Sequence, residues 1–290
     1  MKPAPFKLVR PTSITEACEA LDEYGDEARL LAGGQSLVPM MNFRLAQPRV
    51  LIDLGSASGL DHIERRNGDL AVGAMVRQRV AERDVSVHDN APLLSRALPF
   101  VGHLQNRNRG TIGGSLAHAD PAAELPAVAL ALDARVRLVK STGERVVPVS
   151  EFFEGWFTTT IAPGEVVAET LFPVRGDSLA AVHELARRHG DFAVAGIALV
   201  VNTNDGDTAE HAGVAAFGVS SQPVRLTGVE GALRGARLDA GTISEASRLA
   251  ASEVLDATED VHASAEYRRE ALGTLLARAL GDVAGQRTGV

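Results

Sequence analysis

The chain has 290 residues, of which 45% are hydrophobic and 23% charged, and its formal net charge is −8 at pH 7. This length suits one large domain or two smaller ones, and the negative charge gives no electrostatic support to a nucleic-acid partner. Cys18 is the only cysteine, which excludes an intrachain disulfide, a cysteine-ligated iron–sulfur cluster and a cysteine-rich zinc site. No secretory signal is visible and no apolar run approaches the ~20 residues of a membrane span, so we expect a cytoplasmic protein.

Residues 1–55 predict a small α/β lobe of alternating short elements. The stretch "SITEACEALDEYG" predicts a helix that Thr12 or Ser13 caps and that ends at Gly25. The elements expected after it are a buried strand over 28–34, a helix over 37–45 with Ser36 placed to cap it, and a second buried strand over 49–55.

The middle of the chain, to about residue 177, mixes strand and helix patterns. We expect a strand over 70–76, a helix over 91–102, a hairpin over 134–149 and a strand over 164–173. A further helix is expected over 119–134, with Asp120 as its cap and Pro121 at its first position.

After residue 177 the order of elements changes to strands followed by helices, which indicates a separate α+β unit. Two strands are expected over 195–203 and 211–226, joined by an Asn/Asp/Gly turn, and two helices over 242–255 and 264–280. The glycine-spaced segment 228–235, "GVEGALRG", predicts a loop because polar residues surround it and no buried strand precedes it.

Two glycine pairs stand out, Gly33-Gly34 before Gln35-Ser36 and Gly113-Gly114 before Ser115. Such a loop can point successive backbone N–H groups and a hydroxyl at phosphate oxygens, and two loops can hold a pyrophosphate from opposite sides. The alternative is that each pair only makes a tight turn. Neither pair continues into the Lys-Ser/Thr of a P-loop or forms the spaced glycines of a Rossmann fingerprint.

The segments "AGGQSLVPMMNFRL" and "RNRGTIGGSLAHADPAAELP" together resemble the two FAD-binding loops of the medium subunit of molybdenum hydroxylases, the family of xanthine dehydrogenase and aerobic carbon monoxide dehydrogenase. "LARRHGDFAVAGIALVV" is similar to the start of that family's C-terminal domain. The resemblance implies an α+β protein with a PCMH-type FAD-binding domain over 1–177, in two α/β lobes at about 1–55 and 56–177. A C-terminal domain of the carbon monoxide dehydrogenase flavoprotein type is expected over 178–290.

The resemblance also implies which residues contact FAD. The first loop would wrap the pyrophosphate with Leu30, Leu31, Ala32, Gly33, Gly34, Gln35, Ser36 and Leu37. The second loop would contribute Thr111, Ile112, Gly113, Gly114 and Ser115, with His118 and Glu124 near the ribityl or phosphate region. Val101, Gly102 and Val167 would line the cofactor cleft, Glu184 stands where some relatives carry a lysine, and Phe192 would lie against the isoalloxazine ring.

The function that this resemblance implies is electron transfer by an oxidoreductase subunit. A large partner subunit would carry the molybdenum cofactor and a small one the [2Fe–2S] clusters, in a dimer of heterotrimers, and electrons would pass through FAD to an external acceptor. No residue of this chain is then expected to be catalytic. The alternatives are a stand-alone FAD oxidase of the vanillyl-alcohol-oxidase-like fold and a non-catalytic binding protein.

Two further groups of polar residues have alternative interpretations. His118, Asp120 and Glu124 contain metal-ligand types, but Asp120 is better explained as a helix cap, so no metal is expected. Arg107 and Arg109 can neutralise FAD phosphates or contact a partner, and we expect them to be surface charges.

Overall fold

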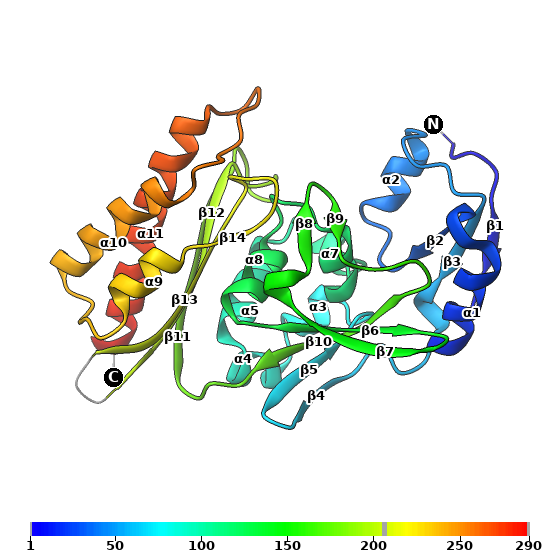
Figure 1. Cartoon of the computed structure of the whole chain (residues 1–290), viewed down its shortest axis with the longest axis horizontal. Coiled ribbons are helices and arrows are strands. Elements are labelled where there is room, and N and C mark those ends of the chain that lie inside the picture. Colours follow the sequence, from blue (N-terminus) through cyan, green and yellow to red (C-terminus); the bar gives the residue numbers. More distant parts are fainter. Residues whose placement is uncertain (1, 205–207, 289–290) are drawn as a thin grey trace.

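The computed structural model describes residues 2–204 and 208–288. Its main sheets have three, five and four strands, and they follow one another across the molecule in chain order (Figure 1). The N-terminal lobe lies at one end and the last sheet with its long helices at the other. The expected α+β architecture, with two lobes followed by a C-terminal unit of antiparallel strands and helices, is therefore confirmed.

The N-terminal lobe is a three-stranded parallel sheet in the order β1-β3-β2, with strands at Lys7–Val9, Val50–Asp53 and Ala28–Leu31. Helix α1 (Ile14–Tyr24) begins as predicted, because the Ser13 side chain accepts a hydrogen bond from the Glu16 N–H. Helix α2 (Leu37–Asn42) also forms, but the Ser36 hydroxyl makes no capping hydrogen bond, so its predicted capping role is wrong.

The second lobe is built on an antiparallel sheet in the order β4-β5-β10-β6-β7. Its strands are Ile63–Arg66, Asp69–Gly73, Val166–Pro173, Arg135–Lys140 and Gly143–Pro148, and the small β8-β9 pair is Phe153–Gly155 and Thr158–Thr159. Its helices are α3 (Gln78–Ala81), α4 (Val85–Asn90), α5 (Pro92–Ala97), α6 (Leu104–Arg107), α7 (Ile112–His118) and α8 (Glu124–Ala131). The predicted strand near 70, the hairpin over 134–149 and the strand over 164–173 are all confirmed.

The predicted start of helix α8 is wrong by several residues. Asp120 is not its cap, because its carboxylate instead accepts the Ala122 N–H within a turn (2.9 Å). The helix begins at Glu124, with Ala123 at the cap position. Local turn formation by aspartate competes with helix capping, and here the turn is the outcome.

The C-terminal unit is an antiparallel sheet in the order β11-β12-β13-β14, with strands Ser178–Leu185, Ala195–Thr203, Ala209–Phe217 and Val224–Arg225. The expected helices form as α10 (Ala240–Glu253) and α11 (Ala265–Thr288). The Asn/Asp/Gly turn falls partly on residues 205–207, which lie outside the described residues. Segment 228–235 is not a loop, because most of it forms α9 (Thr227–Leu233).

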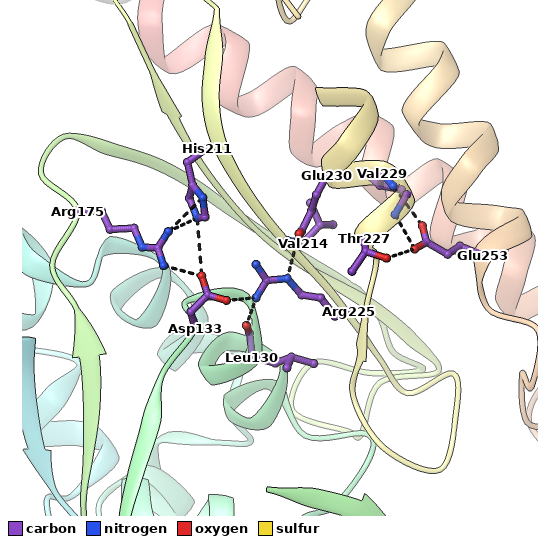
Figure 2. A network of polar contacts seen from close by, with 11 residues as sticks. Leu130, Asp133, Arg175, His211, Val214, Arg225, Thr227, Val229, Glu230 and Glu253 are labelled. Atoms are coloured by element: carbon purple, nitrogen blue, oxygen red, sulfur yellow. Dashed lines mark hydrogen bonds and ion pairs between the residues drawn. The ribbon is translucent and has the colours of Figure 1, made fainter. Parts of the chain in front are cut away.

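Helices cover both faces of the C-terminal sheet. Helices α5 and α8 of the second lobe pack on one face, while α9 and α11 pack on the other and α10 packs on both of them. A polar network reinforces this junction, and Figure 2 shows Asp133 between Arg175 and Arg225. The Asp133 carboxylate accepts hydrogen bonds from these two guanidiniums at 2.5 and 2.7 Å. The second lobe and the C-terminal unit thus share one hydrophobic core, which fixes the segments that lie between them.

Although α11 has 24 residues, no helix within 2–204 and 208–288 combines the length and apolar character needed to cross a bilayer.

Candidate functional site

The first glycine pair follows strand β2 and leads into α2. Gly34 adopts φ +72°, a conformation that favours glycine. The five consecutive N–H groups of Gly33–Leu37 donate no hydrogen bond to any residue that the structure describes. The segment therefore presents a row of backbone donors, as the sequence suggested for an anion site.

The two glycine loops touch each other. A Cβ on Gly33 would lie 2.4 Å from the Arg109 carbonyl oxygen and 2.7 Å from Gly110 Cα, both backbone atoms. A Cβ on Gly114 would lie 3.2 Å from that of Ala32. Glycine is required at Gly33 by this close approach and not by its own backbone conformation, since its φ is one that other residues adopt.

The second loop does not present the row of outward N–H groups that the sequence suggested. The Ile112 and Gly113 N–H groups donate to the carbonyls of Val76 and Ala74, at 3.0 Å each. The Thr111 side chain accepts the Gly114 N–H, also at 3.0 Å. This loop is therefore a rigid support for the first loop, and what it can still offer a ligand is side chains such as the Ser115 hydroxyl.

Positive charge gathers where the loops meet. Arg77 donates to the Arg109 carbonyl, the same oxygen that lies against Gly33. Burial and the neighbouring Arg109 guanidinium lower the pKa of Arg77, so the two cations lie close enough to repel each other. An anion placed between them would relieve that repulsion. Arg77 was not among the predicted site residues, because its proximity to the loop depends on the fold alone.

The prediction for Arg109 as an exposed charge is confirmed, but the prediction for Arg107 is wrong. Arg107 is 8% exposed, pairs with Glu82 at 2.9 Å and donates to the carbonyls of Val101 and Gly102 at 3.1 and 3.0 Å. It therefore holds the 101–102 turn in place, and that turn carries two of the predicted cleft residues.

A third loop, between β11 and β12, lies close to the other two. The ring of His103 occupies the space where Gly190 would carry a Cβ, at 2.6 Å. Asn106, on the same segment as His103, donates to the Gln35 side chain of the first loop at 3.2 Å. Phe192, on the third loop, is 67% exposed. Segments from both lobes and the C-terminal unit thus meet around one region.

Two carboxyl groups flank this region. Burial raises the pKa of Glu124, at the start of α8, to about 7. Burial, and then the nearby Glu124 carboxyl, raise the pKa of Glu184, on β11, to about 8. Burial also lowers the pKa of His118, whose ring lies 5.1 Å from that of Phe157. Among the described residues, no three His, Cys, Asp or Glu side chains gather as a metal site would require.

Beside Phe192 opens a cavity of about 500 Å³, lined among others by Trp156, Arg187, Phe192, Asp260 and Arg268. Arg268 of α11 is 4% exposed and donates to the Val194 carbonyl at the base of the third loop (2.5 Å). The aromatic walls suit a planar group, and the buried arginine fixes the loop that supplies one of them.

Not every predicted residue offers its side chain to this region. Leu30 packs in the core of the N-terminal lobe, while Ile112 and Val167 are buried in the core of the second lobe, at 1% and 6% exposure. The others gather near the three loops: the backbone of Gly33–Leu37, the 101–102 turn, Ser115, His118, both glutamates and Phe192.

Comparison with known families accounts for nearly the whole chain. Residues 4–175 match the family described as the FAD binding domain in molybdopterin dehydrogenase. Residues 180–283 match the carbon monoxide dehydrogenase flavoprotein C-terminal domain.

Individual relatives match over nearly their full length. The chain is 40% identical to the 6-hydroxypseudooxynicotine dehydrogenase complex subunit alpha of Paenarthrobacter nicotinovorans, over 97% of this chain and 95% of the relative. It is 34% identical to the carbon monoxide dehydrogenase medium chain of Hydrogenophaga pseudoflava, over 97% of each.

Solved structures of related enzymes superpose closely on this chain. A carbon monoxide dehydrogenase structure from Hydrogenophaga pseudoflava superposes with a TM-score of 0.94 at 34% identity, covering 99% of both chains. Quinoline 2-oxidoreductase from Pseudomonas putida 86 gives 0.93 at 33% identity, again covering 99% of both chains.

Proposed function

Because the chain belongs to the family that carries the FAD binding domain of molybdopterin dehydrogenases, we propose that it binds FAD across its two glycine loops. The observation that carries this proposal is the row of unbonded N–H groups over Gly33–Leu37, beside the Arg77 and Arg109 guanidiniums. Backbone donors and fixed positive charge are what a pyrophosphate requires. The residues present therefore fit the cofactor.

Each loop has its own part in this assignment. The first loop donates N–H groups to the pyrophosphate, while Thr111–Ser115 braces it and adds the Ser115 hydroxyl. The ribityl and flavin end of the cofactor would lie toward the 101–102 turn, His118, Glu124, Glu184 and Phe192, near where the three loops meet. We take 1–177 as the FAD-binding domain and 178–290 as the C-terminal domain, which agrees with the two family matches.

The chain is an oxidoreductase subunit whose bound FAD would accept electrons and release them. The protein's own part is to orient the flavin, exclude water from one side and leave an approach for the acceptor. We assign that approach to the cavity beside Trp156 and Phe192. Electrons would arrive from a small [2Fe–2S] subunit and originate at a large molybdenum-cofactor subunit, in a dimer of heterotrimers. Relatives named as a complex subunit and as a medium chain support this arrangement.

A stand-alone FAD oxidase is the weaker alternative. Such an enzyme needs a substrate-binding domain, whereas this chain covers 95% or more of relatives that are named as single subunits. The intact donor row of the first loop also argues against a protein that has lost its cofactor.

The test is a visible absorption spectrum of the purified chain, alone and co-expressed with its large and small subunits, before and after addition of FAD. We expect a bound flavin spectrum that reductant bleaches, and co-purification of both partners. If the folded chain never takes up FAD in either form, the flavoprotein assignment is wrong and the glycine pairs are turns only.

A further inference from the structure

Two carboxyl groups, the buried Glu124 and the half-buried Glu184, form no ion pair with any residue that the structure describes. Glu124 is 7% exposed, and its carboxylate forms no hydrogen bond or ion pair with any described side chain. Glu184 is likewise without an ion pair, and its Oε2 atom is shielded from solvent and accepts no hydrogen bond. A buried acceptor in this state is costly, and each such group in a native structure calls for an explanation.

The strand register shows which way Glu184 points. Ala180 and Val182 of β11 belong to the core shared with α5 and α8, so Glu184, two residues on, faces the same side. His183 faces the opposite side, where it contacts Asp282 of α11 at 2.8 Å. Glu184 therefore points toward helix α8, whose first residue is Glu124.

No residue that the structure describes donates a hydrogen bond to the Oε2 atom of Glu184. Glu184 pairs across the sheet with Gly196, and the ring of Phe217 fills the space above Gly196, 2.1 Å from where a Cβ would stand. An aromatic ring beside a carboxyl group favours its neutral form. The apolar Phe217 ring and the acidic Glu124 carboxyl thus both favour the neutral form of Glu184.

The other charged groups near Glu124 and Glu184 do not neutralise these two carboxyl groups. Besides burial, Asp120 raises the pKa of Glu124 by like-charge repulsion. Arg107 has a weaker, opposite effect, and its guanidinium forms its ion pair with Glu82. His118 interacts with Asp120, and burial keeps it neutral at pH 7. Repulsion between these two neighbouring, desolvated carboxyl groups disfavours ionisation of both at neutral pH.

The pair lies at the edge of the flavin site. Strand β11 runs from Glu184 directly into the loop that carries Gly190 and Phe192, and the Val194 N–H closes that loop on the Leu185 carbonyl at 2.7 Å. Helix α8 follows the second glycine loop and α7. A charge that develops in the cleft is therefore felt by both carboxyl groups.

We propose that Glu124 and Glu184 share one proton at neutral pH, and that the pair takes up a second proton from solvent when the neighbouring flavin is reduced. The electrons come from an external one-electron donor, an iron–sulfur partner in the complex or dithionite in the test. On the pair, only one O–H bond forms, with a proton from water. The proposal rests on the proposed function for its second half, whereas the shared proton is a property of the chain alone.

The first test needs no cofactor. The carboxyl carbons of ¹³C-glutamate-labelled apoprotein are followed by NMR from acid to alkaline pH. We expect Glu184 to titrate near pH 8, and Glu124→Gln to move that titration toward the ordinary glutamate range because one like charge is removed. If both carboxyl groups titrate near the ordinary value of about 4.3, the shared proton does not exist and the proposal fails.

The second test uses the FAD-loaded protein in its complex. The flavin midpoint potential is measured against pH in the wild type, in Glu184→Gln and in the control Glu210→Gln, which removes an exposed carboxylate from the same sheet. We expect a steeper fall of potential with pH between about pH 7 and 9 in the wild type and the control than in Glu184→Gln. Infrared difference spectra on reduction should show a gain of protonated carboxyl that Glu184→Gln lacks.

Each result decides something different. Equal pH slopes in Glu184→Gln and the wild type, with FAD bound to both, overturn the coupling to the flavin. Failure of the wild type to bind FAD overturns the proposed function, and the NMR titration of the apoprotein then decides the shared proton by itself. If only Glu184→Gln loses FAD, Glu124→Gln replaces it in the potential measurement.

Discussion

Replacement of Gly33 by alanine tests the contact between the two glycine loops. The new Cβ would lie 2.4 Å from the Arg109 carbonyl oxygen, about 1 Å inside ordinary van der Waals contact. The atoms it meets are backbone and cannot swing aside, so the loops must move apart by about that amount. Overpacking of this kind costs about 1–3 kcal/mol. If FAD binding requires the loops in contact, its affinity should fall by about 5- to 150-fold.

The assay is titration of the apoprotein with FAD, followed by flavin absorption and fluorescence. The matched control is Gly231→Ala, which adds the same methyl group in α9 where no atom lies within 4 Å. Alanine in an exposed helix position should stabilise the fold slightly, by about 0.5–1 kcal/mol, and leave FAD affinity unchanged. Circular dichroism and thermal unfolding of both variants separate a local effect from loss of the fold.

Wild-type FAD affinity in a folded Gly33→Ala protein would refute the reasoning. In that case the packing of the first loop on Arg109 would not determine the pyrophosphate site. Equal loss of affinity in Gly33→Ala and Gly231→Ala would be equally damaging, because it would show that the effect does not depend on the close approach.

Three further predictions concern charged side chains. Arg77→Gln should weaken FAD binding about tenfold at low salt, by isothermal titration, and the deficit should shrink as ionic strength rises, whereas a salt-independent loss would point to altered loop structure. Burial alone would raise the pKa of Glu169, but hydrogen bonds led by that from Arg137 outweigh it and lower that pKa. The stabilisation that ionised Glu169 gives to the folded state is therefore present above about pH 4.3. It is lost as pH falls through the lowered pKa. Glu169→Gln should cost about 3 kcal/mol in urea unfolding at pH 7, and this cost should shrink as pH falls through the lowered pKa. Asp133→Asn keeps a residue that tolerates φ +54° but removes the charge between Arg175 and Arg225, so thermal unfolding should report a loss of about 1 kcal/mol.

Local patterns predicted much of the fold. The Ser13-capped helix, the hairpin over 134–149 and the strand–glycine–helix order around Gly33 all appear where the sequence placed them. Each depends on neighbouring residues alone: a cap, a two-residue alternation, a glycine pair after a buried strand. The division into two lobes and a C-terminal domain was also implied by the family resemblance, whereas the strand order within the three sheets was not predicted.

The predictions that failed depend on distant residues. Helix α9 forms in a segment expected to be a loop because Glu253 of α10 accepts the N–H groups of Gly228 and Val229. Figure 2 shows Glu253 beside Val229. Arg107 is buried because Glu82 and three carbonyls surround it, and none of these partners forms a pattern with it in the sequence. In both cases a tertiary contact overrides local preference.

The same kind of contact gives the two glycine loops different parts, although their sequences look alike. The carbonyls of Ala74 and Val76 consume the donors of the second loop, whereas the first loop has no neighbour that does so. If FAD binds as proposed, affinity for its pyrophosphate should reside mainly in the N-terminal lobe and the Arg77–Arg109 pair, and the second loop should act by holding that lobe in place. Substitutions that tilt the lobe, such as Gly33→Ala, should weaken phosphate binding even though every donor is still present.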